Sequence, residues 1–174
     1  PAVLRQALGT ALLEVDSARD AAPGTVPVWI FGHGIFSTPE DYLSDLDDPS
    51  AVVAVADAAG AIVIATPWRG LTLSDLGSVL GAVADFGRLP EVTDKLAQGL
   101  VNQATLLDLV ADGALLDDPV FEGLADPDQL FYYGISLGAI EGAAWLARED
   151  RFRAAVLHVG GSAWSTMLER SFPW

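Results

Sequence analysis

The sequence contains no cysteine, so it offers neither a disulfide, a thiolate metal site nor a cysteine nucleophile. Basic residues are also scarce: nine lysines and arginines stand against 24 aspartates and glutamates, a formal net charge of −15. So acidic a chain repels phosphate backbones and anionic lipid, which argues against nucleic-acid binding and electrostatic docking on membranes. The lack of cysteine and the start at Pro1 slightly favour an extracytoplasmic location.

Long apolar runs are missing as well. No run reaches the ~18 residues that a membrane span requires, because the best stretch, residues 51–68, is interrupted by Asp57. No signal peptide is visible in residues 1–4, which lack a basic flank and a long apolar core. Since the first residue is proline, we expect a processed or excised piece of a longer chain. With 174 residues, of which 51% are hydrophobic, the sequence predicts one globular domain.

Lysine and arginine are absent between Lys95 and Arg148, and acidic residues accumulate between Asp108 and Asp128. We interpret this acidic stretch as a solvated face. The alternative is a calcium site built from carboxylate oxygens, although no spacing here matches an EF-hand loop. The sequence otherwise indicates no cofactor and no metal.

Short apolar runs alternate with helical patterns along the chain. Strands are expected over residues 26–32, 61–66, 129–133 and 153–159. Helices are expected over residues 50–59, 90–111 and 137–146. Apolar strands separated by helices predict an α/β fold, a mostly parallel sheet with helices on both faces. Residues 2–15 carry both helical leucine spacing and a strand-like segment, so their pattern leaves the choice open.

The most informative motif is the G-x-S-x-G pattern from Gly134 to Gly138, with Ser136 at its centre. It lies between an expected strand and an alanine-rich helix, the arrangement that the mechanism of this motif needs. The glycines remove side chains that would collide in a tight turn, so Ser136 can hold a strained backbone with its hydroxyl exposed. The N–H of Leu137 then lies at a helix start, which favours negative charge. The alternative is a turn with an incidental serine.

A second group of residues follows the first expected strand directly, beginning with His33. Gly34 lets the backbone turn toward Ser136, so that the N–H groups of Ile35 and Leu137 face one point. Two such amides form an oxyanion hole, in which one donor is typically worth ~3–4 kcal/mol of transition-state stabilisation. We interpret His33 as a structural histidine that shapes this loop; the alternative is a general base.

With these two motifs the chain resembles the α/β-hydrolase superfamily, specifically its bacterial esterase and lipase branches. The resemblance is carried by residues 28–35 and 132–138, and the similarity in pattern spans roughly residues 26–161. It implies a single, incomplete α/β-hydrolase-like domain over residues 1–174, truncated after the sixth strand. The four expected strands would be the third to sixth of the family's eight. Residues 162–174 resemble the beginning of a lid or cap segment.

The resemblance also implies roles for individual residues. Ser136 would be the nucleophile of a serine hydrolase that cleaves carboxylic esters through an acyl-enzyme. The backbone N–H groups of Ile35 and Leu137 would form the oxyanion hole. The site would be shaped by His33, Gly34, Gly134 and Gly138.

The family's triad runs in the order serine, acid, histidine, and the residues after Ser136 do not complete it. The sole histidine there, His158, falls in an expected strand, where we interpret it as a core histidine rather than a base. We interpret Glu141 as solvated or paired on its helix, although it could line a cleft. The remaining acids are interpreted as surface charge or left unassigned: Glu149, Asp150 and Glu169.

A serine without a base is a poor nucleophile at neutral pH. A sheet ending at residues 156–159 would also expose an apolar edge strand, which invites pairing with another chain. We therefore expect a C-terminal fragment or second chain that completes the sheet and supplies the acid and the histidine. An inactive remnant is the alternative.

The leading hypothesis is thus a serine esterase or lipase acting on a small-molecule or lipid ester. Apolar surface for its substrate would come from Phe36, Ile135 and Trp68, unless Trp68 is packed within its loop. Thioester hydrolysis, acyl transfer and peptide hydrolysis use the same serine-bearing turn, so the sequence does not distinguish these activities from ester hydrolysis. A non-catalytic binding or assembly module on a hydrolase scaffold is the alternative, and a metal-dependent enzyme built on the acidic stretch is a third hypothesis.

Overall fold

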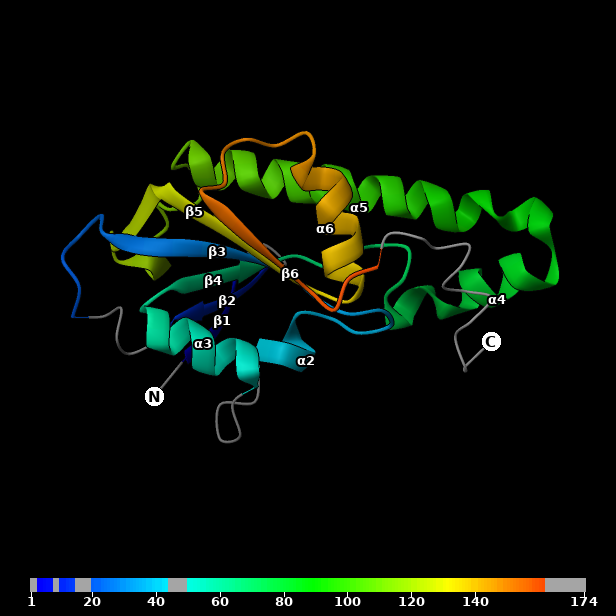
Figure 1. The fold of residues 1–174 in the computed structure, drawn as a ribbon, viewed down its shortest axis with the longest axis horizontal. Helices are drawn as coiled ribbons and strands as arrows, with labels where there is room; N and C mark the ends of the chain where they lie inside the picture. The colour runs from blue at the N-terminus through cyan, green and yellow to red at the C-terminus, as the bar shows by residue number, and fades with distance from the viewer. Residues whose placement is uncertain (1–2, 8–9, 15–19, 44–49, 162–174) are drawn as a thin grey trace.

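The sheet at the centre of the computed structural model has six strands in the order β1-β2-β4-β3-β5-β6 (Figure 1). The residues that the structure describes are 3–7, 10–14, 20–43 and 50–161. The strands are β1 (Val3–Ala7), β2 (Thr10–Glu14), β3 (Val26–Gly32), β4 (Ile62–Ala65), β5 (Ala125–Ile135) and β6 (Ala154–His158). The four strands β4, β3, β5 and β6 run parallel to one another. By contrast, β1 pairs antiparallel with β2, and β2 pairs antiparallel with β4. The predicted mostly parallel sheet is confirmed.

Helices cover both faces of the sheet, as predicted (Figure 1). One face carries α2 (Glu40–Leu43) and α3 (Ala51–Ala59), and the other carries α5 (Pro90–Ala111) and α6 (Leu137–Leu146). Before α5, the chain forms η1 (Leu73–Asp75), α4 (Leu76–Ala84) and η2 (Phe86–Arg88), and η3 (Pro119–Phe121) follows it. In Figure 1, α4 and the first half of α5 form a hairpin that extends beyond the carboxyl ends of the strands.

The ends of the predicted helices follow local signals. The hydroxyl of Ser50 accepts the N–H of Val53 at 3.4 Å and so caps α3. Gly60 ends the same helix in the left-handed conformation, with φ 60°. Pro90 is the first residue of α5, where its missing N–H costs no hydrogen bond.

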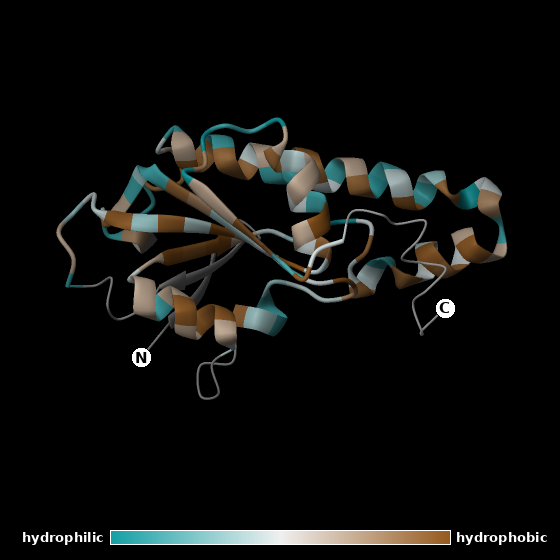
Figure 2. Ribbon diagram, viewed as in Figure 1, coloured by the Kyte–Doolittle hydropathy of each residue, from teal (hydrophilic) through white to brown (hydrophobic). Residues whose placement is uncertain are grey.

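The hydrophobic core is centred on β3 and β4, where apolar residues are concentrated (Figure 2). Val28, Ile30 and Ile64 are completely buried, and Ile30 lies opposite both Ile64 and Tyr132 in the sheet register. Because helices cover these strands on both sides, their sequences are apolar without alternation.

The strand β6 is exposed, as expected for a sheet that ends at this strand: Val156 is 52% and Leu157 44% exposed. Among the described strands, β6 pairs only with β5 and therefore forms an edge of the sheet. His158 is exposed for the same reason, so its interpretation as a core histidine was wrong.

The open choice for residues 2–15 is decided by β1 and β2, which form an antiparallel pair. β5 begins at Ala125, earlier than expected, because this residue pairs with Val26 despite the polar stretch that follows it. The proposed lid or cap segment, residues 162–174, lies outside the described residues. None of the helices described here has the length and apolarity that a bilayer crossing demands.

Candidate active site

Ser136 lies at the junction of β5 and α6 with an unusual backbone conformation, φ 52° and ψ −109°. A positive φ is rare for a residue with a side chain and costs of order 1–3 kcal/mol. The surrounding hydrogen bonds hold the serine in place: its N–H donates to the carbonyl of His158 at 3.0 Å, and its own carbonyl accepts the N–H of Ala139 at 3.0 Å. The side chain is half-buried. The turn therefore has the strained, partly exposed serine that the motif indicated.

The glycines around Ser136 allow three backbone segments to touch. A Cβ on Gly138 would overlap the carbonyl group of Gly32 at the end of β3, and a Cβ on Gly134 would overlap the carbonyl group of Gly138. A side chain on Gly134 would force apart the turn of residues 134–138, which we name the elbow, and one on Gly138 would push the elbow away from β3. The glycine spacing of the motif is thus a requirement of close packing.

The loop after β3, residues 33–37, which we name the β3 loop, lies directly beside the elbow. A Cβ built on Gly34 would be 3.8 Å from the Cβ of Ser136. The N–H of Gly138 also donates to the carbonyl of His33 at 2.9 Å. The structure therefore brings together the two motifs that are far apart in sequence.

The imidazole of His33 is fully buried, and both of its nitrogens are engaged. Nε2 accepts the N–H of Trp68 at 2.8 Å, and Nδ1 donates to the carbonyl of Gly34 at 2.7 Å. Because one partner can only donate and the other can only accept, the ring is neutral with its proton on Nδ1. Burial lowers the pKa of His33, although the hydrogen bond to Gly34 acts in the opposite direction. His33 therefore joins two loops and has no free nitrogen for a substrate.

The peptide unit between Gly34 and Ile35 has a defined orientation. Its carbonyl accepts hydrogen bonds from His33 and, at 2.8 Å, from the hydroxyl of Ser37. In a trans peptide the N–H points opposite to the carbonyl, so the N–H of Ile35 faces away from these two donors. Within the described residues, neither this N–H nor that of Leu137, the first residue of α6, donates to a main-chain carbonyl.

No general base accompanies Ser136 among the described side chains, since none of their imidazoles or carboxylates forms a hydrogen bond with its hydroxyl. His158 lies next to Ser136 through its main chain, but its Nδ1 pairs with the hydroxyl of Tyr133 at 2.9 Å. Glu141 is half-buried on α6, and this burial raises the pKa of its carboxyl group.

The other acids considered from the sequence do not reach the elbow. Glu149 binds Arg151 at 2.7 Å, and Asp150 is exposed. Glu169 lies outside the described residues. In the parts of the chain that the structure describes, no three His, Asp or Glu side chains cluster to hold a metal ion. The calcium alternative finds no support there, and Asp108 of the acidic stretch forms an ion pair with Arg151 at 2.7 Å.

Trp68, for which the sequence left open either substrate surface or packing, does not offer surface to a substrate. Its side chain is only 1% exposed and packs edge-on against Trp145, with ring centroids 6.4 Å apart. The alternative that Trp68 is packed is therefore correct, and its packing extends beyond its own loop to α6. The two other apolar residues named from the sequence, Phe36 and Ile135, are half-buried and pack against the hydrophobic core.

Two features near the site were missed by the sequence reasoning. The hydroxyl of Tyr42 lies against Gly34, within 2.7 Å of the position that a Cβ there would take. Asp75 is a buried carboxylate that accepts hydrogen bonds from Gly70 and Thr72 and pairs with Lys95. Nothing in the sequence pointed to Tyr42, but the spacing Thr72-x-x-Asp75 is that of a capping box and could have revealed the second feature.

Similar architectures occur among solved structures. A protein assigned as a dienelactone hydrolase, from Klebsiella pneumoniae subsp. pneumoniae MGH 78578, aligns with a TM-score of 0.54 at 20% sequence identity. The alignment covers 87% of this chain and 53% of that chain, so this chain spans about half the length of that protein. Aspergillus niger EstA aligns with a TM-score of 0.39 at 19% identity, over 77% of this chain and 22% of its own. The sequence matches no protein-family model and no curated protein.

The first of these alignments, together with the strand order, defines the class of fold. The chain has an α/β-hydrolase-type fold, as the motifs after β3 and β5 predicted. The four strands expected from the sequence are β3 to β6, the third to sixth strands along the chain.

Proposed function

We propose that this chain carries the nucleophile and oxyanion hole of a serine hydrolase that cleaves carboxylic esters. The observation that carries the proposal is the backbone of Ser136, held at φ 52° between β5 and α6 beside the β3 loop. A strained conformation persists only where the surrounding structure enforces it, and such residues cluster at active sites.

In the proposed reaction, the hydroxyl oxygen of Ser136 attacks the ester carbonyl carbon while a base takes its proton. The tetrahedral oxyanion accepts hydrogen bonds from the N–H groups of Ile35 and Leu137. The alcohol leaves with a proton from the base, and water then cleaves the acyl-enzyme by the same route. The start of α6 adds the positive end of a helix dipole to the oxyanion site.

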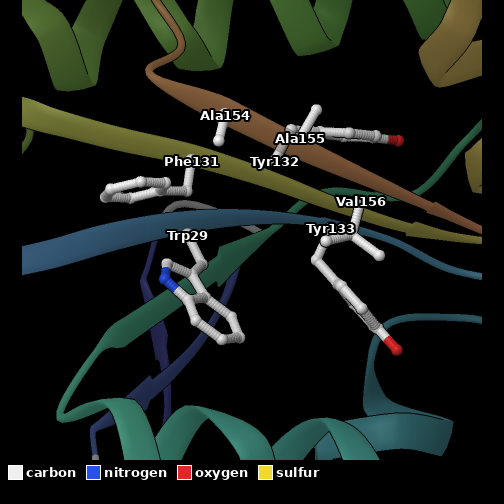
Figure 3. Close-up of a pocket in the computed structure, with 7 residues that line it drawn as sticks. All are labelled: Trp29, Phe131, Tyr132, Tyr133, Ala154, Ala155 and Val156. Atoms are coloured by element: carbon white, nitrogen blue, oxygen red, sulfur yellow. The ribbon is translucent and has the colours of Figure 1, made fainter.

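The base must come from outside the described residues, because the described histidines are engaged elsewhere. We propose that a C-terminal fragment or a second chain pairs with β6 and brings the histidine and the acid. The edge of β6, which pairs with β5 alone among the described strands, supports this, as does an apolar hollow of about 90 Å³ beside it (Figure 3). In Figure 3 the side chains of Trp29, Tyr133 and Val156 point to the same side of the sheet, where they would pack against the added segment.

The esterase proposal is tested by labelling the intact protein with a fluorophosphonate probe. Mass spectrometry should locate the adduct on Ser136, and Ser136→Ala and heat-denatured protein should both stay unlabelled. An adduct on another residue, or an unlabelled native protein with an intact circular-dichroism spectrum, would contradict the proposal.

The absence of a described base beside Ser136 favours a second candidate, a non-catalytic binding or assembly module on the hydrolase scaffold. In that case the native, folded protein would bind its partner but react with no acyl or phosphonyl probe. The labelling experiment therefore separates the two candidates directly.

A further inference from the structure

The orientation of the Ile35 amide depends on contacts on both of its sides. On one side, the peptide between Gly34 and Ile35 is held by His33 and Ser37. On the other side, the N–H of Phe36 donates to the carbonyl of Leu71 at 2.7 Å. The two peptide planes that flank Ile35 are therefore both anchored, and neither can rotate without breaking a hydrogen bond.

Both of these anchors lead to residues 66–72, the segment after β4, which we name the β4 loop. Leu71 belongs to it, and so does Trp68, whose N–H fixes the ring of His33 at 2.8 Å. The β4 loop thus determines where the β3 loop, and with it the amide of Ile35, is held relative to Ser136.

The β4 loop is itself held by one buried carboxylate. Oδ2 of Asp75 accepts the N–H of Gly70 at 2.8 Å, the N–H of Thr72 at 3.1 Å and the hydroxyl of Thr72 at 2.7 Å. These donors lie on either side of Leu71, so the carboxylate fixes the carbonyl that Phe36 uses. Gly70 has φ +100° and no room for a Cβ against Leu96, which shows how closely the loop follows α5.

The second oxygen of the carboxylate connects this loop to the helical hairpin. Nζ of Lys95, on α5, donates to Oδ1 of Asp75 at 3.0 Å and to the hydroxyl of Ser78, on α4, at 2.9 Å. Asp75 is only 4% exposed, and a buried carboxylate is stable as an anion only with such a partner. Lys95 therefore couples the positions of α4 and α5 to the β4 loop.

We propose that Asp75 and Lys95 are positioning residues for the oxyanion hole, acting on the amide of Ile35 through the β4 loop. Neither residue touches the reacting atoms. The inference rests on the proposed ester hydrolysis and adds a specific consequence to it: breaking the pair displaces a donor that matters only in the transition state. The loss then falls on kcat and leaves KM unchanged.

The test compares the hydrolysis of p-nitrophenyl esters by the intact protein and by four variants. Lys95→Met removes the ammonium group but keeps the stem, and we expect kcat to fall about tenfold or more with an unchanged KM. Lys95→Arg should restore most of the activity. Thr72→Val, which removes one donor to Asp75, should lower kcat by a smaller factor. Arg88→Met is the matched control, because Arg88 and Glu91 form an exposed ion pair on the same hairpin.

A trifluoromethyl ketone distinguishes positioning from a general loss of structure. Its adduct with Ser136 carries an oxyanion, so Lys95→Met should weaken its inhibition by the same factor as kcat, while inhibition by the product carboxylate stays unchanged. All assays are run below the measured unfolding temperature of each variant, and Thr72→Val serves as the main test if Lys95→Met does not fold.

Wild-type kcat in both Lys95→Met and Thr72→Val, or an equal loss in Arg88→Met, overturns the positioning inference alone. Wild-type protein without esterase activity or Ser136 labelling overturns the proposed function first, and the inference with it.

Discussion

The main-chain N–H of Trp68 donates to Nε2 of His33 across 2.8 Å, so a residue of the β4 loop fixes the tautomer of a buried histidine in the β3 loop. A protonated ring would lose this acceptor, because Nε2 would then carry a proton. The contact thus links the geometry of the site to the charge of one imidazole.

The stability of the protein should therefore decrease in mild acid. The pKa of His33 is lowered in the folded state by burial, so its contribution is fully present above the unfolded value of 6.5. It is lost as the pH falls below that value toward the folded pKa, because the unfolded chain binds the proton first. Urea unfolding between pH 8 and pH 5 should show this loss. His158→Gln, at an exposed histidine, should keep the pH dependence, and His33→Gln should reduce it; an identical curve in all three proteins would contradict the assignment.

Gly138→Ala should disrupt the elbow. The added Cβ would overlap the carbonyl of Gly32, which is backbone and has little freedom to move, so we expect a loss of about 3 kcal/mol in unfolding free energy and no labelling of Ser136. Gly77→Ala is the control: no atom lies within 4 Å of its Cβ position. On a helix this change should stabilise the protein by about 0.5–1 kcal/mol. Equal effects of the two substitutions would refute the packing argument.

Ser136→Gly should relieve the backbone strain that Ser136→Ala retains. Glycine adopts positive φ without steric cost, so we expect Ser136→Gly to be more stable than Ser136→Ala by about 1 kcal/mol, measured by thermal and urea unfolding. Both variants should lose the fluorophosphonate adduct. A Ser136→Ala protein as stable as Ser136→Gly would mean that the turn stores no strain.

Asp75→Asn should destabilise the protein at neutral pH. Burial alone would raise the pKa of this carboxyl group, but the hydrogen bonds from Thr72, Lys95 and Gly70 outweigh it and lower the pKa to about 2. The shift from 3.8 corresponds to about 2 kcal/mol, present above pH 3.8 and lost as the pH falls through about 2. Asp85→Asn, at an exposed carboxylate bonded to Gly87, is the control and should change stability by less than about 1 kcal/mol. Equal losses in both variants would show that the hydrogen bonds and the ion pair of Asp75 carry no extra stability.

The edge of β6 should be protected in the intact protein if a further strand pairs with it. Hydrogen exchange followed by mass spectrometry should then show β6 peptides exchanging as slowly as those of β3, because the outward N–H groups gain partners. The peptide over η2, at an exposed end of the hairpin, provides the rapidly exchanging reference. Rapid exchange over β6 would contradict the proposed pairing, and with it the proposal that the added segment supplies the catalytic histidine.

Much of the fold followed from local sequence signals. The continuous apolar runs of β3 and β4 predicted buried strands because these strands are covered on both faces. Pro90 and Gly60 marked helix ends through restrictions on their own backbones. The glycine spacing around Ser136 identified the elbow for the same reason, since the constraint belongs to the chain within a few residues of the serine.

Features that depend on residues far apart in the sequence were decided by the tertiary structure alone. His158 has an apolar strand around it in sequence, yet it is exposed because no described strand lies beyond β6. The sequence left open whether Trp68 lines the substrate site or is packed, and the packing against α6 shows that it is buried. The pair of Asp75 and Lys95 joins residues whose contact no local pattern predicts, because it forms only when α5 folds back over the β4 loop. Steric constraints between residues close in sequence could thus be predicted from the sequence. Burial and the pairing of distant residues could be determined only from the folded chain.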